Sequence, residues 1–320
     1  MTRSNRQHVA SCVMILLCAL LAQPLLAQST VARPKILGIS HVSFFVSDLP
    51  KALDLWQGLL GYADPYDDIK YRDGSVHIAF LKINDHQHIE LFKEQPPAGE
   101  GRLSHLAFIT DNAEQMHLYL AAHGVAVPNK VETDSLGDLS FKVKDPDGNL
   151  IEFVQPLPTG LEARNAGKSL PDTRISDRIF HAGFLVGDTQ QSLNFYGSIL
   201  GFREFWRGSS NGKTLSWIDM RVPTGDDYVE FMLYSDLPAP DKRGGQNHVS
   251  LAVPDVAKSI AILEARPTYK TYAKPIASHI GVNGQRQVNL FDPDGTRVEL
   301  MEPVTASGKP VPPSTAPPPR

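Results

Sequence analysis

Cysteine is scarce in this sequence. The 320 residues contain two cysteines, Cys12 and Cys18, and both lie close to the N-terminus. The rest of the chain therefore has no thiol, which excludes disulfides, thiolate catalysis and sulfur-ligated metal ions there. Any metal ion held by the folded part must be bound through nitrogen and oxygen.

The sequence also lacks a large excess of either sign of charge, and it has no long hydrophobic run. The formal net charge is −4, with basic and acidic residues interspersed, so we expect no nucleic-acid partner. The apolar run "VMILLCALLA" is well under the ~20 residues that span a bilayer, so we expect no stable membrane anchor. The hydrophobic content of 42% and the charged content of 21% are typical of a globular protein.

The N-terminus has the pattern of a secretory signal. Arg3 and Arg6 precede the apolar run, and the small residue Ala27 stands before Gln28 at the expected cleavage site. We therefore expect residues 1–27 to be a signal peptide and the protein to be exported, to the periplasm or outside the cell.

The chain contains an internal duplication. "ISHVSFFVSDLPKALDLWQGLLGY" from Ile39 and "IFHAGFLVGDTQQSLNFYGSILGF" from Ile179 share a strand-like run with histidine, then aspartate, then a helical segment. The histidines of these two segments, His41 and His181, are 140 residues apart. We expect a first module over 36–157 and a second over 178–303.

Each half divides again into two similar units. "LSHLAFITDNAEQMHLYLAAHGV" and "QNHVSLAVPDVAKSIAILEARP" repeat the strand, aspartate and helix pattern, giving four units that begin near His41, His105, His181 and His248. Strand-like segments follow each helix, and "DPDG" joins two of them at Asp145 and again at Asp292. The fold class expected is α+β, with four βαβββ units.

Two segments lack this pattern. Residues 158–177 combine proline, glycine and charge, and we interpret them as a linker between the modules. Residues 304–320 are rich in proline, and we expect a disordered tail.

A histidine on the first strand and a glutamate on the last strand recur in every unit. Titratable side chains that interrupt apolar strands need compensating partners if their face of the sheet is buried. Two imidazoles and two carboxylates suit Fe, Zn, Ni, Co or Mn, with open positions left for substrate oxygens. The candidate metal ligands are His41, Glu90, His105, Glu152, His181, Glu230, His248 and Glu299.

These residues resemble the vicinal oxygen chelate (VOC) superfamily, which includes glyoxalase I, extradiol dioxygenases, and fosfomycin and bleomycin resistance proteins. The resemblance rests on "SHVSFFVSD", "FHAGFLVGD", "HIELF", "YVEFM" and the two "DPDG" hairpins, and it covers about Gly38 to Pro303. It implies two VOC modules, each with a metal ion inside a cup of strands. The units can pair within each half, or across the halves so that His41 and Glu90 join His248 and Glu299.

The complete ligand sets resemble those of glyoxalase I most closely. That resemblance implies a lyase or isomerase acting through a metal-chelated enediolate on a small substrate with vicinal oxygens, with Glu152 or Glu299 as the catalytic base. Where glyoxalase I carries an arginine and an asparagine for glutathione, this chain has Phe45 and Glu94 in the first half. We therefore expect no glutathione dependence.

Two alternatives stay open. An Fe(II) extradiol ring-cleaving dioxygenase would use His181, His248 and Glu299, although Lys142 and Asn289 replace its characteristic tyrosine. A binding protein of the resistance type would hold a small molecule without chemistry.

Three further residues are expected to bind substrate. His88 and Tyr228 lie two positions before Glu90 and Glu230, and Arg297 lies two before Glu299. Strand periodicity places each of them on the same face as the following glutamate.

Overall fold

The computed structural model describes residues 31–66, 77–313 and 316–317. The expected signal peptide at residues 1–27 and parts of the expected tail lie outside this range. No helix in the described part is long and apolar enough to cross a membrane.

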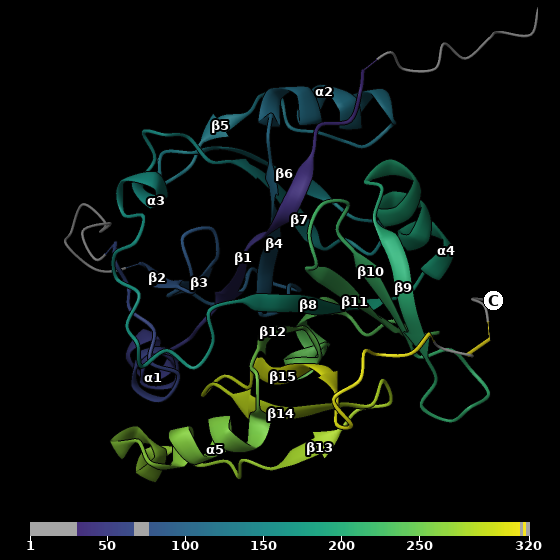
Figure 1. The fold of residues 1–320 in the computed structure, drawn as a ribbon. Helices are drawn as coiled ribbons and strands as arrows, with labels where there is room; N and C mark the ends of the chain where they lie inside the picture. Colours follow the sequence, from purple (N-terminus) through teal and green to yellow (C-terminus); the bar gives the residue numbers. More distant parts are fainter. Residues whose placement is uncertain (1–30, 67–76, 314–315, 318–320) are drawn as a thin grey trace, which may run out of the picture.

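The described chain folds into two curled mixed sheets with few helices, which confirms the α+β class and the two-module architecture (Figure 1). The first sheet has the spatial order β2 (Ile78–Lys82), β3 (His88–Phe92), β1 (Ile36–Phe45), β4 (Leu103–Thr110), β7 (Leu150–Gln155), β6 (Leu139–Lys144) and β5 (Glu132–Thr133). The second has the order β13 (Ser278–Ile280), β14 (Gln285–Phe291), β15 (Arg297–Thr305), β12 (His248–Ala252), β8 (Ile179–Val186), β11 (Tyr228–Leu233), β10 (Trp217–Arg221) and β9 (Arg203–Gly208).

The strand order shows which units pair. β1 lies between β3, to which it is parallel, and β4, to which it is antiparallel. β8 has the same place between β11 and β12 in the second sheet. Units one and two therefore share the first sheet and units three and four share the second, so the units pair within each half.

A helix follows the first strand of each unit, and it begins at an aspartate or asparagine. Asp48, Asn112, Asp188 and Asp255 each accept a hydrogen bond from the backbone N–H three residues later, which satisfies one of the free N–H groups of the first turn. The helices of the chain are α1 (Leu49–Leu53), η1 (Asp54–Leu59), α2 (Ala113–Ala122), α3 (Leu161–Arg164), α4 (Thr189–Ser192), η2 (Leu193–Ile199), η3 (Pro240–Lys242), η4 (Gly244–Gln246), α5 (Val256–Glu264) and η5 (Pro267–Thr271). Of these, η1 and η2 are π-helices at equivalent places in the two halves.

One hydrophobic core runs through both halves. Trp56 of η1 and Tyr196 of η2 are fully buried at equivalent positions. The helices also contact one another across the halves: Tyr119 of α2 donates to the carbonyl of Ile199, and Thr268 of η5 donates to that of Gly58. The two modules are thus packed into a single unit.

The two "DPDG" turns connect the halves as well as reversing the chain. Asp147 of the first turn accepts hydrogen bonds from the N–H of Gly187 (3.0 Å) and the hydroxyl of Ser192 (3.1 Å), both in the second half. Asp294 of the second turn accepts from the N–H (2.7 Å) and hydroxyl (2.6 Å) of Ser47 in the first half. The second aspartate of each turn therefore binds the strand-to-helix junction of the other module.

A second polar contact joins the first strands of the two sheets. Gln87 and Asp227 are separated by the same 140 residues as the duplicated histidines, and the Gln87 amide donates to the Asp227 carboxylate at 3.2 Å. Gln87 accepts from the N–H of Ile179 (2.8 Å), while Asp227 accepts from the N–H of Ile39 (3.1 Å). Each of the two side chains thus binds the backbone of the other half.

The segments outside the two sheets are partly structured. Residues 158–177, expected to be a plain linker, contain α3. The last strand, β15, extends to Thr305, two residues into the expected tail, and Ala306 donates its N–H to the carbonyl of Gly284. Pairing with β14 explains this extension, because the edge of the sheet satisfies the backbone groups of the added residues.

We predict that Asp294→Ala will destabilise the fold by about 1 to 3 kcal/mol, because it removes hydrogen bonds from Ser47 to a charged group. It also removes the ion pair with Arg102 (3.2 Å), in which the Asp294 side chain is 9% exposed. Urea unfolding measures the change. Asp226→Ala is the control, since its carboxylate is 72% exposed and lies 3.8 Å from Arg221. Equal effects of the two substitutions would contradict the bridging role of Asp294.

Candidate metal centre

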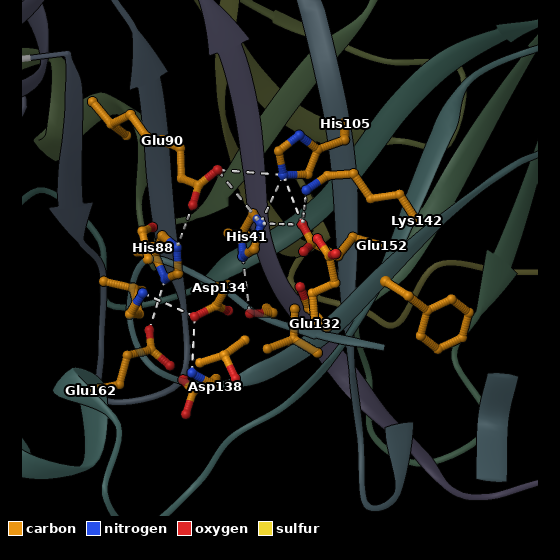
Figure 2. Close-up of a pocket in the computed structure, with 18 of the residues that line it drawn as sticks. His41, His88, Glu90, His105, Glu132, Asp134, Asp138, Lys142, Glu152 and Glu162 are labelled. Atoms are coloured by element: carbon orange, nitrogen blue, oxygen red, sulfur yellow. Dashed lines mark hydrogen bonds and ion pairs between the residues drawn. The ribbon is translucent and has the colours of Figure 1, made fainter. Parts of the chain in front are cut away.

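The four ligand candidates of the first half lie on neighbouring strands of one sheet. His41 is on β1, Glu90 on β3, His105 on β4 and Glu152 on β7. Ser43 of β1 stands opposite both Glu90 and His105 in the strand register. Because side chains alternate between the faces of a strand, this register directs all four ligand candidates into the hollow of the sheet (Figure 2).

Their donor atoms converge on one point. His41 Nε2 lies 3.1 Å from His105 Nε2 and 3.3 Å from Glu152 Oε2, and His105 Nε2 lies 2.9 Å from Glu152 Oε2. Glu90 Oε2 lies 3.7 Å from His41 Nε2 and 3.4 Å from His105 Nε2. Each carboxylate therefore approaches both imidazoles.

This arrangement fits a divalent metal ion. Ligands bound at about 2.0 to 2.2 Å lie roughly 3 to 3.6 Å from their neighbours around the ion, close to the distances observed. Two imidazoles and two carboxylates without sulfur suit the metals expected from the sequence. His41, His105 and Glu152 form one group of mutually close donor atoms, and His41, His88 and Glu90 form another.

Serine hydroxyls lie within hydrogen-bonding distance of the Nδ1 atoms of the two imidazoles, on the side away from the ligand set. His41 Nδ1 lies 3.2 Å from the hydroxyl of Ser40, and His105 Nδ1 lies 3.1 Å from that of Ser104. Ser43 donates to Glu90 Oε2 at 2.6 Å. Contacts of this kind fix the orientation of a ligand, and an acceptor at Nδ1 leaves Nε2 free to bind an ion.

The buried charges of this site stabilise one another. Burial alone would raise the pKa of Glu90, but the imidazoles of His41 and His105 hold it well below its usual range. Burial likewise opposes ionisation of Glu152, yet the same imidazoles and Lys142, whose Nζ lies 2.9 Å away, keep its pKa low. Both carboxylates are therefore ionised and available as ligands.

A second imidazole–carboxylate pair adjoins the ligand set, and one member was not expected from the sequence. His88 stacks on His41 with ring centroids 4.5 Å apart, and its Nδ1 lies 2.8 Å from Glu162 Oε1. Its Nε2 lies 3.5 Å from Glu90 Oε1. Burial alone would lower the pKa of His88, but Glu162, followed by Glu90, raises it to about 10.

Glu162 comes from α3, in the segment expected to be a linker. A single glutamate in a stretch rich in proline and glycine gives no periodic signal, so only the path of the chain places it here. Glu162, His88 and the ligand set share a cavity of about 650 Å³. Its wall also carries other charged residues: Lys130, Glu132, Asp134, Asp138 and Lys142.

The second half brings the equivalent residues together beside a cavity of about 520 Å³, which Glu230 and Glu299 line. His181 Nε2 lies 3.1 Å from His248 Nε2 and 3.4 Å from Glu299 Oε2. Glu230 Oε2 lies 3.6 Å from His248 Nε2. In this second set each glutamate lies near one imidazole, whereas each glutamate of the first set lies near both.

Charge is arranged differently around the second set. Burial, followed by repulsion from Glu299, raises the pKa of Glu230 to about 7, and burial also raises that of Glu299. Burial and the nearby Arg297 lower the pKa of His181 to about 3. Asp219, which stands opposite Glu230 in the register, adds a third buried carboxyl group.

The three residues expected to bind substrate have different surroundings. His88 lines the first cavity and Arg297 lines the second. Tyr228 lies behind the second set, where its ring packs against His181 with centroids 4.5 Å apart. It also packs against Phe180 and Phe205, and its hydroxyl contacts Met301 Sδ at 3.8 Å.

The family model of the Glyoxalase/Bleomycin resistance protein/Dioxygenase superfamily matches residues 38–153 and 178–300. The chain belongs to this superfamily. The two matched segments coincide with the two sheets, each of which carries one His-Glu-His-Glu set.

Solved structures of the superfamily share the fold. Homoprotocatechuate 2,3-dioxygenase from Brevibacterium fuscum aligns with a TM-score of 0.62 and 19% identity, over 86% of this chain and 74% of that one. A Mn(II)-bound glyoxalase from Novosphingobium aromaticivorans aligns with a TM-score of 0.63 and 17% identity, over 84% and 83% of the two chains. At these identities the similarity concerns the fold alone.

A curated relative matches part of the chain. The uncharacterized protein YwbC of Bacillus subtilis (strain 168) is 27% identical over an alignment of 129 residues, and the match covers 37% of this chain and 96% of that protein. The length of the match corresponds to one module of this two-module superfamily member.

We predict that Glu162→Gln will weaken the fold in a pH-dependent way. The pKa of His88 is raised above its unfolded value, so the ion pair stabilises the protein fully below about pH 6.5 and loses its effect as the pH rises through about 10. Urea unfolding of metal-stripped wild type and variant should therefore differ more at pH 6 than at pH 10. Glu132→Gln, at an exposed ion pair with Lys130, is the control. A difference that is the same at both pH values would contradict the His88–Glu162 pair.

Proposed function

We propose that this protein is a divalent-metal-dependent lyase or isomerase that acts through an enediolate on a small substrate with vicinal oxygens. The observation that carries the proposal is the convergence of two imidazoles and two ionised carboxylates at the base of the first cavity. His41, Glu90, His105 and Glu152 would hold the ion. When bound, it would polarise the substrate oxygens and stabilise the negative charge that develops on proton removal.

Glu152 is the proposed base of the first site. Its carboxylate lies at the floor of the cavity, and Lys142, whose side chain is 41% exposed, contacts it from the cavity side. A carboxylate in this position can take a proton from a carbon next to a carbonyl group. Lys142 then offers its ammonium group to a substrate oxygen.

Glu90 is the proposed counterpart that returns the proton. Its Oε1 faces His88 at 3.5 Å, and Glu162 holds the opposite nitrogen of that ring. Because Glu162 keeps His88 protonated, the Nε2–H group of His88 faces Glu90. This group can donate a hydrogen bond to Glu90 whether the carboxyl group is charged or neutral. His88 and Glu162 thus position Glu90.

The residues that line the first cavity favour a substrate other than glutathione. Acidic side chains surround the first set, among them Glu132, Asp134 and Asp138. Burial, reinforced by Asp138 and Glu152, raises the pKa of Asp134 to about 6. A wall of this composition disfavours a ligand with several carboxylates, and Phe45 is buried where an arginine would be needed.

Ring-cleaving dioxygenase activity is the second candidate. It is favoured by the fold similarity to homoprotocatechuate 2,3-dioxygenase, which has been solved with 3,4-dihydroxyphenylacetate, a compound with vicinal oxygens. His181, His248 and Glu299 form a group of close donor atoms that suits this chemistry.

We predict that the protein will catalyse exchange of the CH₂ protons of hydroxyacetone with D₂O, measured by NMR, when a divalent metal ion is added. Glu152→Gln should slow this exchange by about 10² to 10⁴-fold, since it removes the base. Glu132→Gln at the cavity rim is the matched control and should retain the rate. Equal rates in wild type and Glu152→Gln would contradict the proposal, and oxygen uptake with catechols under Fe(II) would favour the dioxygenase.

We also propose that the protein is exported, on the basis of its N-terminal pattern. Edman sequencing or intact mass of the protein from its native host should give an N-terminus at Gln28. An N-terminus at Met1 or Thr2 would contradict export through this signal.

A further inference from the structure

A buried lysine, Lys82, lies beside the first site. It is the last residue of β2, it stands opposite His88 in the strand register, and it is 2% exposed. Its Nζ donates to the backbone carbonyls of Asn165 (2.7 Å) and Lys168 (3.0 Å) and lies 2.7 Å from the carboxylate of Asp85. Three acceptors match the three N–H bonds of an ammonium group, so they compensate for its removal from water.

These contacts attach residues 161–168, here called the α3 segment, to the edge of the first sheet. Asp85 binds this segment a second time, because both of its carboxylate oxygens accept from the N–H of Gly167 (2.9 and 3.0 Å). At the other end of the segment, the N–H of Leu161 donates to the carbonyl of Leu136 at 2.7 Å. The α3 segment is therefore attached at both of its ends.

Glu162 lies between the two attachments. It is 8% exposed, and its Oε1 lies 2.8 Å from Nδ1 of His88. The helix that carries it has four residues, which is too short to be stable by itself, so the position of Glu162 depends on the contacts at the two ends. Lys82 is thus connected to Glu90 through the α3 segment, Glu162 and His88.

The equivalent residues of the second half make different contacts. Tyr228 takes the place of His88, and Arg221, which stands opposite Tyr228 in the register, takes the place of Lys82. The guanidinium group of Arg221 lies 4.4 Å from the centre of the Phe205 ring and 3.8 Å from Asp226. The lysine and the histidine thus accompany each other in the first half, and both are replaced in the second.

We propose that Lys82 is a positioning residue of the first site. By holding the α3 segment, it keeps Glu162 and His88 in place beside Glu90. The inference rests on the proposed function and deepens it, because Glu90 is the group proposed to return the proton. Among the described residues, Glu162 lines the first cavity and Lys82 does not. Lys82 therefore affects the reaction without contacting the substrate.

Limited trypsin digestion of the purified protein, followed by mass spectrometry, tests the attachment of the α3 segment. Lys82→Met should speed cleavage after Arg164 and Lys168 by about tenfold or more, because local opening exposes these bonds, and cleavage elsewhere should be unchanged. Lys82→Arg keeps donors for the two carbonyls and should restore the wild-type rate. Lys51→Met is the matched control, because Lys51 also pairs with an aspartate three positions away, Asp48, but its side chain is 67% exposed.

The exchange of hydroxyacetone protons with D₂O tests the role in the reaction. With Zn²⁺ added, Lys82→Met should lower kcat by about tenfold or more and leave KM unchanged, because a misplaced group slows the reaction without altering the contacts to substrate. When Lys82→Met is added to Glu162→Gln, kcat should change by less than about twofold, since Lys82 acts through Glu162. A general loss of structure would instead add to the effect of Glu162→Gln.

Two results would overturn the inference and leave the proposed function intact: equal cleavage of the α3 segment in wild type and Lys82→Met, or additive effects of Lys82→Met and Glu162→Gln on kcat. No exchange in wild type with any of the expected metals would overturn the proposed function and, with it, the positioning role. If Lys82→Met does not fold, Asp85→Ala removes the acceptor of Gly167 and one partner of Lys82, and it should cause the same faster cleavage and the same non-additive loss of kcat. Wild-type behaviour of this variant would contradict the inference.

Discussion

The burial of two imidazoles and two carboxylates within one curled sheet is the constraint on which the first module depends. None of these residues is more than 7% exposed, and such groups are tolerated in the interior only when they satisfy one another. The register of β3, β1, β4 and β7 achieves this by bringing every donor atom to within hydrogen-bonding or ion-pairing distance of two others. Ser40 and Ser104 orient the imidazoles, and the ammonium group of Lys142 offsets part of the negative charge.

The connections between the modules follow from the same duplication. Each "DPDG" turn delivers a glutamate to its own ligand set and an aspartate to the other half, so one short motif serves the site and the interface together. Gln87 and Asp227 also join the two halves near the first strands, with each side chain bound to the backbone of the opposite half. The two sets are therefore held in one packed unit even though each is built from its own sheet.

The sequence predicted the fold and the convergence of the ligand candidates, because periodicity and duplication are properties of the chain itself. Repeated histidine, aspartate and glutamate positions sufficed to place four units and two sets. The sequence could not predict Glu162, which reaches the cavity through the path of an irregular segment, or that Tyr228 packs behind His181. It placed Arg297 on the same face of the strand as Glu299, but the approach of the guanidinium group to His248 depends on side-chain packing that no local pattern encodes.

The proposed function requires a metal ion bound by His41, Glu90, His105 and Glu152. Anomalous diffraction from crystals of the protein grown with Mn²⁺ tests this most directly. We expect a strong anomalous peak within about 2.0 to 2.3 Å of donor atoms from these side chains. Well-ordered side chains in hydrogen-bonded contact with no anomalous peak between them would contradict it.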